Sequence, residues 1–454
     1  MKLIKYFAFF LLLNSLVWGS SIFLGFSQDD FFHLEIARAD SLRTFLEFFN
    51  PRANNWQFFR PLSTQVWYFM FERLFGWQKA ALPMHLAAIF IHSINTTLVF
   101  TLVKKIWKLK ISLAFTFASL YAIASVHFLS LYYVGATQQL LASMFSLLVL
   151  HASLKNQTFK SSFFYLFALL SKELSLRLAP IVVLVHLLSG KSLSDSVKKS
   201  KNIIVLTLVY LLFRYLFKVV IAPEYTLDFS IFTTLATLMW YVLMSFGAPE
   251  YLLRFGLSHG QIDVLGYVSS VYPLSTINAV TVALSLILFV TILLIQLRKS
   301  PSARHFFPLA LLWLAGIAPV LFLPTHRYSH YLDLSLFFVL FFLVTAKKSF
   351  LKVILIISLT TAFLSGNLLD RQTHWTIERS LSAQKYLLFL TSAGYCQYSA
   401  LYFVGNQTAT NNLSYALMNE HGPQIACSRH DLSVYYSDTA PKNMEDDVGV
   451  IKVE

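Results

Sequence analysis

The stretch that decides the fold is IKYFAFFLLLNSLVWGSSIFLGF, residues 4–26, followed at once by SQDDFFH, residues 27–33. A helix of about twenty apolar residues spans the hydrocarbon core of a bilayer, and residues 4–26 reach that length. Further apolar runs of spanning length or slightly less begin near residues 82, 111, 136, 161, 177, 202, 277, 306, 331 and 351. The sequence therefore predicts an all-α polytopic membrane protein with about eleven transmembrane helices.

The composition of the 454-residue chain supports this class. Hydrophobic residues make up 56% and charged residues 13%, whereas soluble domains average about 45–50% and about 25%. A disordered or fibrous chain is also excluded, because 43 Phe, 22 Tyr and 8 Trp accompany only 15 Gly and 13 Pro. An integral, multi-pass membrane protein is the class that remains.

The net charge of +14 comes from short basic clusters that lie between the apolar runs. If the N-terminus is cytoplasmic, the inner loops contain 18 Lys and Arg residues and a single acidic residue, Asp195. Such an excess marks the cytoplasmic side, so we expect the active surface on the extracytoplasmic side of a plasma or inner membrane. The basic clusters form no stripe interleaved with aromatic residues, which argues against nucleic acid as a partner.

Two long loops fall on the outer side in this topology, residues 27–81 and 221–276. Within the second loop, residues 230–247 are apolar enough to cross the membrane. A crossing there would place the later basic loops outside, so we expect an interfacial helix instead.

The chain divides into a transmembrane domain, residues 1–366, and a tail, residues 367–454, that loses the apolar character. We expect the tail to be a small extracytoplasmic domain. It contains both cysteines of the chain, Cys396 and Cys427. On an oxidising face such a pair forms a disulfide; the alternative is two free buried thiols.

Asp29 and Asp30 follow the first apolar run directly and are the first candidate catalytic residues. A carboxylate at the membrane surface is well placed to remove a proton from an acceptor hydroxyl, as general bases do. The alternative is that an aspartate caps a helix beginning at Phe31. Both roles can hold, because there are two aspartates.

Histidines mark two further places. His85 and His92 are seven residues apart, so they share one face of the second predicted helix and suit hydrogen bonding between helices. His326 and His330 are four apart, a spacing that fits one helical face, and with His33 and an aspartate they are possible ligands of a divalent cation. No known metal-binding motif is present, so no metal site or certain cofactor is assigned.

Taken in order, these residues resemble a known family. The sequence contains Asp29-Asp30, Arg60-Pro61, His85 and His92 with Asn95, Ser171-Lys172-Glu173, Arg214 and Arg327-Tyr328. This order resembles membrane glycosyltransferases of the GT-C superfamily. It is similar to the membrane part of the transmembrane and tetratricopeptide-repeat O-mannosyltransferases and their bacterial relatives, over residues 1–370. The chain departs from that pattern at Ala88, where relatives have Asn, at His326, where they tend to have an acid, and in lacking the repeats.

The resemblance implies an inverting transferase that uses a polyprenyl-phosphate-linked sugar, with Asp29 or Asp30 as the catalytic base. The departing phosphate needs fixed positive charge at the interface, and Arg60, Lys172, Arg214 and Arg327 are all expected at outer helix ends. The alternative for each is snorkelling to headgroups or pairing with Glu173. The fifth apolar run, residues 161–171, is too short to cross unaided, so we expect Lys172 and Glu173 to lie below the surface.

The sequence thus predicts a GT-C-like membrane glycosyltransferase that moves a sugar, in a hexosyltransferase-like reaction, to a hydroxyl of a protein, glycan or lipid. Donor-phosphate binding falls to Arg60, Lys172, Arg214 and Arg327, with His85, His92, Glu173 and Tyr328 in support. The partners are the lipid-linked sugar, membrane lipid and an unidentified acceptor. The rival is a transporter or flippase of lipid-linked sugars, although neither internal repeats nor broken midplane helices are evident.

Overall fold

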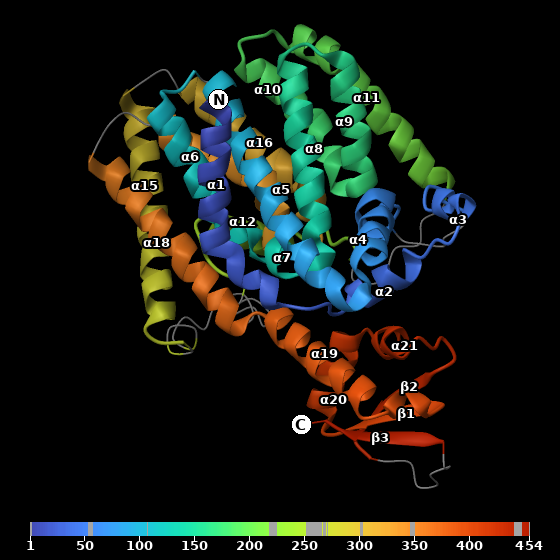
Figure 1. Ribbon diagram of the computed structural model, residues 1–454. Helices are drawn as coiled ribbons and strands as arrows, with labels where there is room; N and C mark the ends of the chain where they lie inside the picture. Colours follow the sequence, from blue (N-terminus) through green and yellow to red (C-terminus); the bar gives the residue numbers. More distant parts are fainter. Residues whose placement is uncertain are drawn as a thin grey trace.

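The computed structural model describes residues 2–52, 58–106, 108–217, 225–250, 266, 269, 271–299, 303–345, 350–439 and 447–453. Most of the described chain is helical, and the helices form one large body from which a smaller C-terminal unit projects (Figure 1). The N-terminus lies at the end of the body opposite that unit (Figure 1).

Each of the predicted apolar runs coincides with a helix. These helices are α1 (Lys2–Trp18), α5 (Trp77–Ile106), α6 (Ile111–Ile123), α8 (Thr137–Leu154), α9 (Thr158–Ser171), α10 (Leu178–Leu188), α11 (Leu193–Leu216), α15 (Leu274–Lys299), α16 (Ala303–Ile317), α17 (Asp333–Thr345) and α18 (Phe350–Thr373). Helical structure is therefore confirmed for all the runs.

Fewer of these helices can cross a bilayer by themselves. Among the described residues, five helical segments are long and apolar enough: Leu3–Phe23, Trp77–Lys105, Val134–Leu154, Leu274–Arg298 and Phe350–Ser392. A sixth is obtained if the bent pair Ile111–Ile123 and Ser125–Tyr132, which meet at 46°, is a single span. The fold is thus that of a helical protein with membrane-type helices, and the number of eleven spans stays a prediction.

A bent segment connects α6 to α8 and runs through the interior of the body. It consists of η3 (Ser125–His127), α7 (Phe128–Tyr132) and η4 (Val134–Ala136), and every residue from 121 to 143 is buried. Polar bonds tie the neighbouring helices together, as is usual between apolar helices. Trp18 Nε1 donates to the carbonyl of Ala122 at 2.9 Å, and Asn14 Nδ2 donates to Ser93 Oγ at 3.1 Å.

Shorter helical elements connect the longer helices. The first predicted loop contains η1 (Gly19–Phe23), α2 (Asp29–Ile36), α3 (Leu42–Glu47), the π-helical turn η2 (Pro61–Val66) and α4 (Trp67–Phe75). Later elements are η5 (Glu173–Arg177), α12 (Ile231–Ser245), η7 (Ala318–Val320) and η8 (Ser329–Leu332). The predicted interfacial segment, residues 230–247, is thus helical as α12. Much of the second predicted loop, residues 221–224 and most of 251–270, lies outside the described residues.

The C-terminal unit, which we define as residues 375–453, contains all the strands of the described chain. It comprises α19 (Trp375–Ser392), η9 (Tyr395–Gln397), β1 (Ala400–Val404), α20 (Gln407–Leu417), α21 (His421–Cys427), β2 (Ser433–Ser437) and β3 (Val448–Lys452). The sheet has the order β2-β1-β3, and both partners run parallel to β1, with Ala400 opposite Ser433 and Val448. This small α/β unit is the exception to the predicted all-α class.

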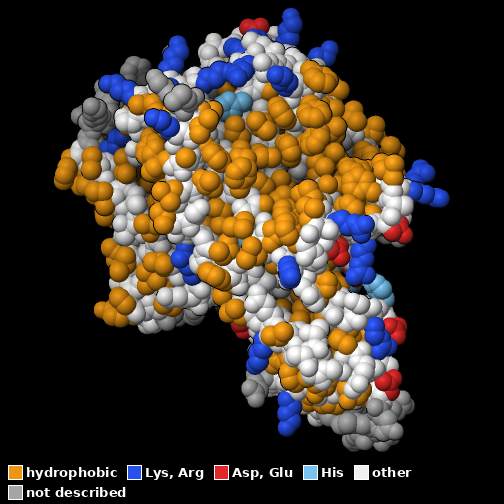
Figure 2. Space-filling model, in the orientation of Figure 1, with side chains coloured by type: hydrophobic (Ala, Val, Ile, Leu, Met, Phe, Trp, Pro, Cys, Tyr) orange, Lys and Arg blue, Asp and Glu red, His pale blue; other side chains and the backbone are white. Residues whose placement is uncertain are grey.

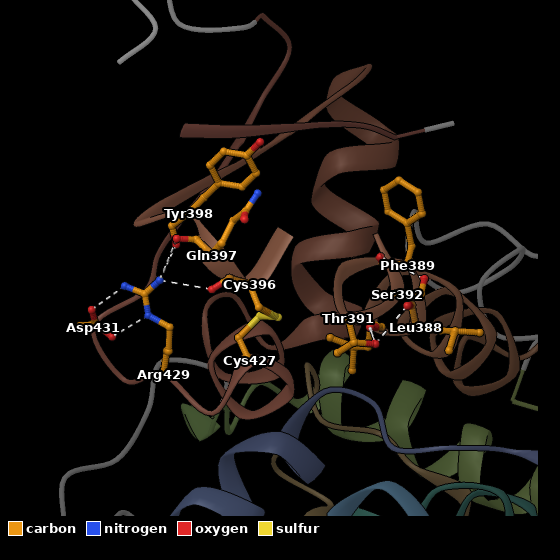
Figure 3. Close-up of a disulfide and its surroundings, with 11 residues drawn as sticks. Leu388, Phe389, Thr391, Ser392, Cys396, Gln397, Tyr398, Cys427, Arg429 and Asp431 are labelled. Atoms are coloured by element: carbon orange, nitrogen blue, oxygen red, sulfur yellow. Dashed lines mark hydrogen bonds and ion pairs between the residues drawn. A yellow bond between two sulfur atoms is a disulfide. The ribbon is translucent and has the colours of Figure 1, made fainter. Parts of the chain in front are cut away.

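A disulfide joins Cys396 and Cys427, as predicted, and so links η9 to the end of α21 (Figure 3). Arg429 lies beside it, pairs with Asp431 at 2.7 Å and donates to the carbonyl of Tyr398 at 2.7 Å (Figure 3). The boundary expected between residues 366 and 367 falls inside α18, which continues to Thr373. The first break in the helix is at His374, where α19 begins.

Candidate functional site

The two aspartates of the first loop have different surroundings. Helix α2 begins at Asp29, not at Phe31, and its N-cap is Gln28, so the expected aspartate cap is wrong. Asp29 is exposed, whereas Asp30 is fully buried. The side chain of Asp30 accepts hydrogen bonds from Tyr68 Oη at 2.5 Å and from the Ser27 amide at 2.9 Å. Burial raises the pKa of Asp30 to about 8, although these two bonds lower it.

Aromatic residues from distant parts of the chain lie within electrostatic range of Asp29. Its charge acts on Tyr133, which follows α7, and on Tyr225 in the second loop. The ring of Tyr225 lies 4.2 Å from that of His326 and 4.8 Å from that of Phe58. Tyr225 is also within electrostatic range of Arg60, Glu173 and Tyr328. The exposed carboxylate therefore shares its surroundings with the predicted cations.

Arg60 is held by partners on two other elements. Its Nε donates to Glu173 Oε2 at 2.6 Å, its second guanidinium contact is to the other oxygen of the same carboxylate, and Nη1 donates to Gln138 Oε1 at 2.7 Å. Burial alone raises the pKa of Glu173, but the guanidinium outweighs it and holds that pKa at about 2. The predicted pairing with Glu173 is thus present, and the charge of Arg60 is matched by one carboxylate.

Lys172 follows the last residue of α9, a helix of only 14 residues. Its side chain is buried in the protein, and Nζ lies 3.1 Å from Nε2 of His330 and 4.9 Å from the centre of the Tyr331 ring. Burial lowers the pKa of Lys172 to about 7, and the neighbouring Arg60 lowers it further. We call Asp29, Arg60, Lys172, Glu173, Tyr225, His326, Tyr328 and His330 the charged cluster.

The segment His326-Arg327-Tyr328 faces this cluster in part. Tyr328 stacks on His330, with ring centres 5.6 Å apart, and burial lowers the pKa of His326 to about 4. Arg327 points elsewhere, because Nε donates to Thr237 Oγ1 at 3.0 Å and the guanidinium lies over Trp240 of α12. The expected shared helical face for His326 and His330 is wrong, since η8 begins only at Ser329.

Arg214, near the end of α11, lies within electrostatic range of the side chain of Tyr210. Tyr210 is in turn within electrostatic range of Glu173 and Arg60. Arg214 is therefore connected to the charged cluster through one tyrosine.

His85 and His92 lie on α5 and bond to backbone, which agrees with the expectation of bonding between helices. His85 Nδ1 is 3.0 Å from the carbonyl oxygen of Leu131, and His92 Nε2 is 3.0 Å from that of Ala122. Leu131 lies in α7 of the bent segment, and Ala122 lies at the end of α6, just before that segment. These histidines therefore support the end of α6 and the bent segment that carries Tyr133, and they do not bond to the predicted cations.

Two polar pairs were not foreseen. Arg177 and Asp333, both almost fully buried, form an ion pair, and Asp333 Oδ2 also accepts from Gln139 Nε2 at 2.8 Å. Glu250 Oε2 lies 3.0 Å from Nε2 of His374, at the break between α18 and α19. An acid inside a predicted span, Asp333, was the only signal in the sequence for the first pair.

Comparisons with known proteins add no identity. No protein-family model matches the chain, and no curated protein matches its sequence. Within the described part of the chain, no group of three or more His, Cys, Asp and Glu side chains could hold a metal ion, so the possible cluster of His33, His326 and His330 does not form there.

Proposed function

We propose that the protein is an integral-membrane, inverting glycosyltransferase of the GT-C type that moves a sugar from a polyprenyl phosphate to an acceptor hydroxyl. The observation that carries the proposal is that the exposed Asp29 and Arg60 of the charged cluster share one aromatic neighbour, Tyr225. Tyr225 lies within electrostatic range of both Asp29 and the Arg60–Glu173 pair. Group transfer from a phosphate needs these two features together, a base for the acceptor and positive charge for the leaving group.

In this mechanism the carboxylate of Asp29 removes the proton of the acceptor hydroxyl. The acceptor oxygen attacks the anomeric carbon from the face opposite the phosphate. The bond between that carbon and the phosphate oxygen breaks, and its electron pair leaves with the polyprenyl phosphate. Asp30 is unsuited to be the base, because it is fully buried and its carboxyl group already accepts two hydrogen bonds.

Lys172 is the cation best suited to the departing phosphate. The charge of Arg60 is matched by Glu173, whereas the ammonium of Lys172 faces the neutral ring of His330. An anion at this position would stabilise the protonated lysine, and in a low-dielectric site that interaction is strong. Arg214 is proposed to support the phosphate, and Arg327, which points toward Thr237 and Trp240, to bind a lipid headgroup beside the cluster.

We further propose eleven spans with a cytoplasmic N-terminus. Lys and Arg side chains gather at one edge of the body, next to a broad hydrophobic band (Figure 2), as the positive-inside rule leads one to expect. The disulfide-bonded unit lies at the other end (Figure 1), which suits an oxidising exterior. Short helices such as α9 can span where the bilayer thins or protein covers their ends.

The rival function, a flippase, would draw support from the buried Arg177–Asp333 pair, because ionisable groups inside membranes often mark substrate paths. Most polar atoms of this pair are, however, already bonded, although Arg177 Nε has no hydrogen-bond partner among the described residues. Arg177 Nη1 donates to the carbonyls of Gly316 at 2.8 Å and Tyr331 at 2.7 Å, while Gln139 and Ser143 donate to Asp333. Such a network joins helices and leaves little for a cargo.

The test is a transfer assay in proteoliposomes with a panel of radiolabelled polyprenyl-phosphate sugars and envelope extract as acceptor. We expect the wild type to transfer label to the acceptor and Asp30→Asn to transfer it at a reduced rate. Asp29→Asn should transfer no label. Asp40→Asn, an exposed aspartate of the same loop, is the matched control and should leave transfer unchanged. Transfer by Asp29→Asn at the wild-type rate would remove the assigned base, and label that crosses the bilayer unaltered would support the flippase.

A further inference from the structure

The linker between η1 and α2, residues 24–28, ends in an unusual backbone conformation. Gln28, the residue before Asp29, has φ 52° and ψ −130°. Residues with a side chain seldom adopt positive φ, because Cβ then crowds the backbone. Such conformations persist only where the surroundings enforce them, and they gather at functional sites.

The surroundings that enforce it belong to the C-terminal unit. The amide of Gln28 donates to the carbonyl of Ala416 in α20 at 2.9 Å, and Arg379 Nη1 of α19 donates to Gln28 Oε1 at 2.7 Å. Arg379 is itself held between aromatic rings, 5.0 Å from Trp375 and 5.0 Å from Tyr415.

The start of the linker is held by α19 as well. Ser380 Oγ accepts from the amide of Gly25 at 2.9 Å and donates to the carbonyl of Gly25 at 3.1 Å. A side chain at position 25 would meet Gln384, since an added Cβ would lie 2.4 Å from its Nε2. Glycine therefore allows the linker to lie directly on α19.

The far end of α2 is docked on the same unit. Glu35 pairs with His421 of α21, and Arg38 Nη1 lies 2.6 Å from Nε2 of His430. Helix α2 is thus held at both ends by the C-terminal unit, while Asp30 anchors its first turn to Tyr68 of the body.

We infer that the C-terminal unit positions the catalytic helix, and that Gln28 is the positioning residue that sets the direction of Asp29. The inference rests on the proposed role of Asp29 as the base. A change in the backbone dihedral angles of Gln28 would change the direction of Asp29, because Asp29 is the next residue and the first of α2. Asp30 cannot correct it, because its own carboxyl is committed to Tyr68 and Ser27.

The experiment compares Gln28→Val, Gln28→Gly and Arg379→Gln in the full-length protein. Valine is branched at Cβ and opposes positive φ, whereas glycine adopts it freely. Lys385→Gln, an exposed cation on the same helix, is the matched control. Two readouts are taken: hydrogen exchange of peptides covering residues 28–38, and kcat and KM of sugar transfer.

We expect faster exchange in α2 for Gln28→Val, with kcat lowered about 10- to 100-fold and donor KM unchanged, and a smaller change of the same kind for Arg379→Gln, which loses the bond to Gln28 Oε1. Gln28→Gly should retain most of the wild-type kcat, a rescue that a merely structural role of the side chain does not predict. Unchanged exchange and kcat in both variants would overturn the inference, as would faster exchange with unchanged kcat. If the variants exchange faster but the wild type transfers no sugar, the proposed function would be wrong. The docking of α2 on the C-terminal unit would still be supported.

Discussion

The alkaline limb of the pH profile is a direct test of Lys172. Its pKa is lowered from 10.5 to about 7 by burial and by Arg60 and Arg177, against the opposing charges of Glu173 and Asp333. If only the protonated lysine binds the donor phosphate, kcat/KM falls as pH rises above 7. Between pH 6 and pH 8 the charged fraction of such a group drops about tenfold, and by pH 9 about a hundredfold. An unperturbed lysine would leave the same range flat.

The assay is the initial rate of transfer at subsaturating donor, from pH 5.5 to 9.5, for the wild type and Lys172→Arg. An arginine stays charged throughout this range, so its profile should lose the limb near pH 7 even if its rate is lower. The pH dependence of folding stability is a second test of the lowered pKa of Lys172. Between pH 7 and 10.5 the unfolded lysine binds more protons than the folded one, so stability should rise with pH there, and less so in Lys172→Met. A limb near pH 7 that persists in Lys172→Arg would refute the reasoning.

Two further predictions concern stability. Asp333→Asn should lower the free energy of unfolding, measured by thermal unfolding in detergent, by about 3–5 kcal/mol, since it leaves Arg177 buried without its charged partner. The double variant Arg177→Met/Asp333→Leu should recover part of this loss, because it removes both charges. No recovery would contradict the assignment of the loss to the unpaired arginine. Replacing Cys396 and Cys427 with Ser should destabilise the C-terminal unit by about 2–4 kcal/mol, seen as faster hydrogen exchange in residues 395–437; equal exchange with and without the disulfide would contradict this.

The helices could be predicted from the sequence because the information is local. An apolar run such as residues 274–299 needs no distant partner to become helical, since a helix satisfies its own backbone. The disulfide could also be predicted from the sequence, because the chain has only two cysteines. The parallel sheet was not, because each strand has five residues and pairs only with segments far along the chain.

The candidate site was foreseen by residue type but not by arrangement. Asp29 and Asp30 are adjacent and alike in sequence, and what separates them is Tyr68, 38 residues away. Arg60 meets Glu173 across 113 residues, so their mutual neutralisation could be offered only as an alternative. Tyr225 carried no pattern, because a single tyrosine in a loop has no spacing to recognise.

The contacts at the break between α18 and α19, at His374, make the two parts of the protein depend on each other in evolution. Glu250 of the second loop is largely buried and bonded to His374, and its other oxygen accepts from the amide of Ser329. Loss of the tail would leave this carboxylate buried without its imidazole, and the linker before α2 without Ser380. The α/β unit is therefore no appendage that recombination could exchange freely. Sequence change on either side of the junction must be matched by change on the other.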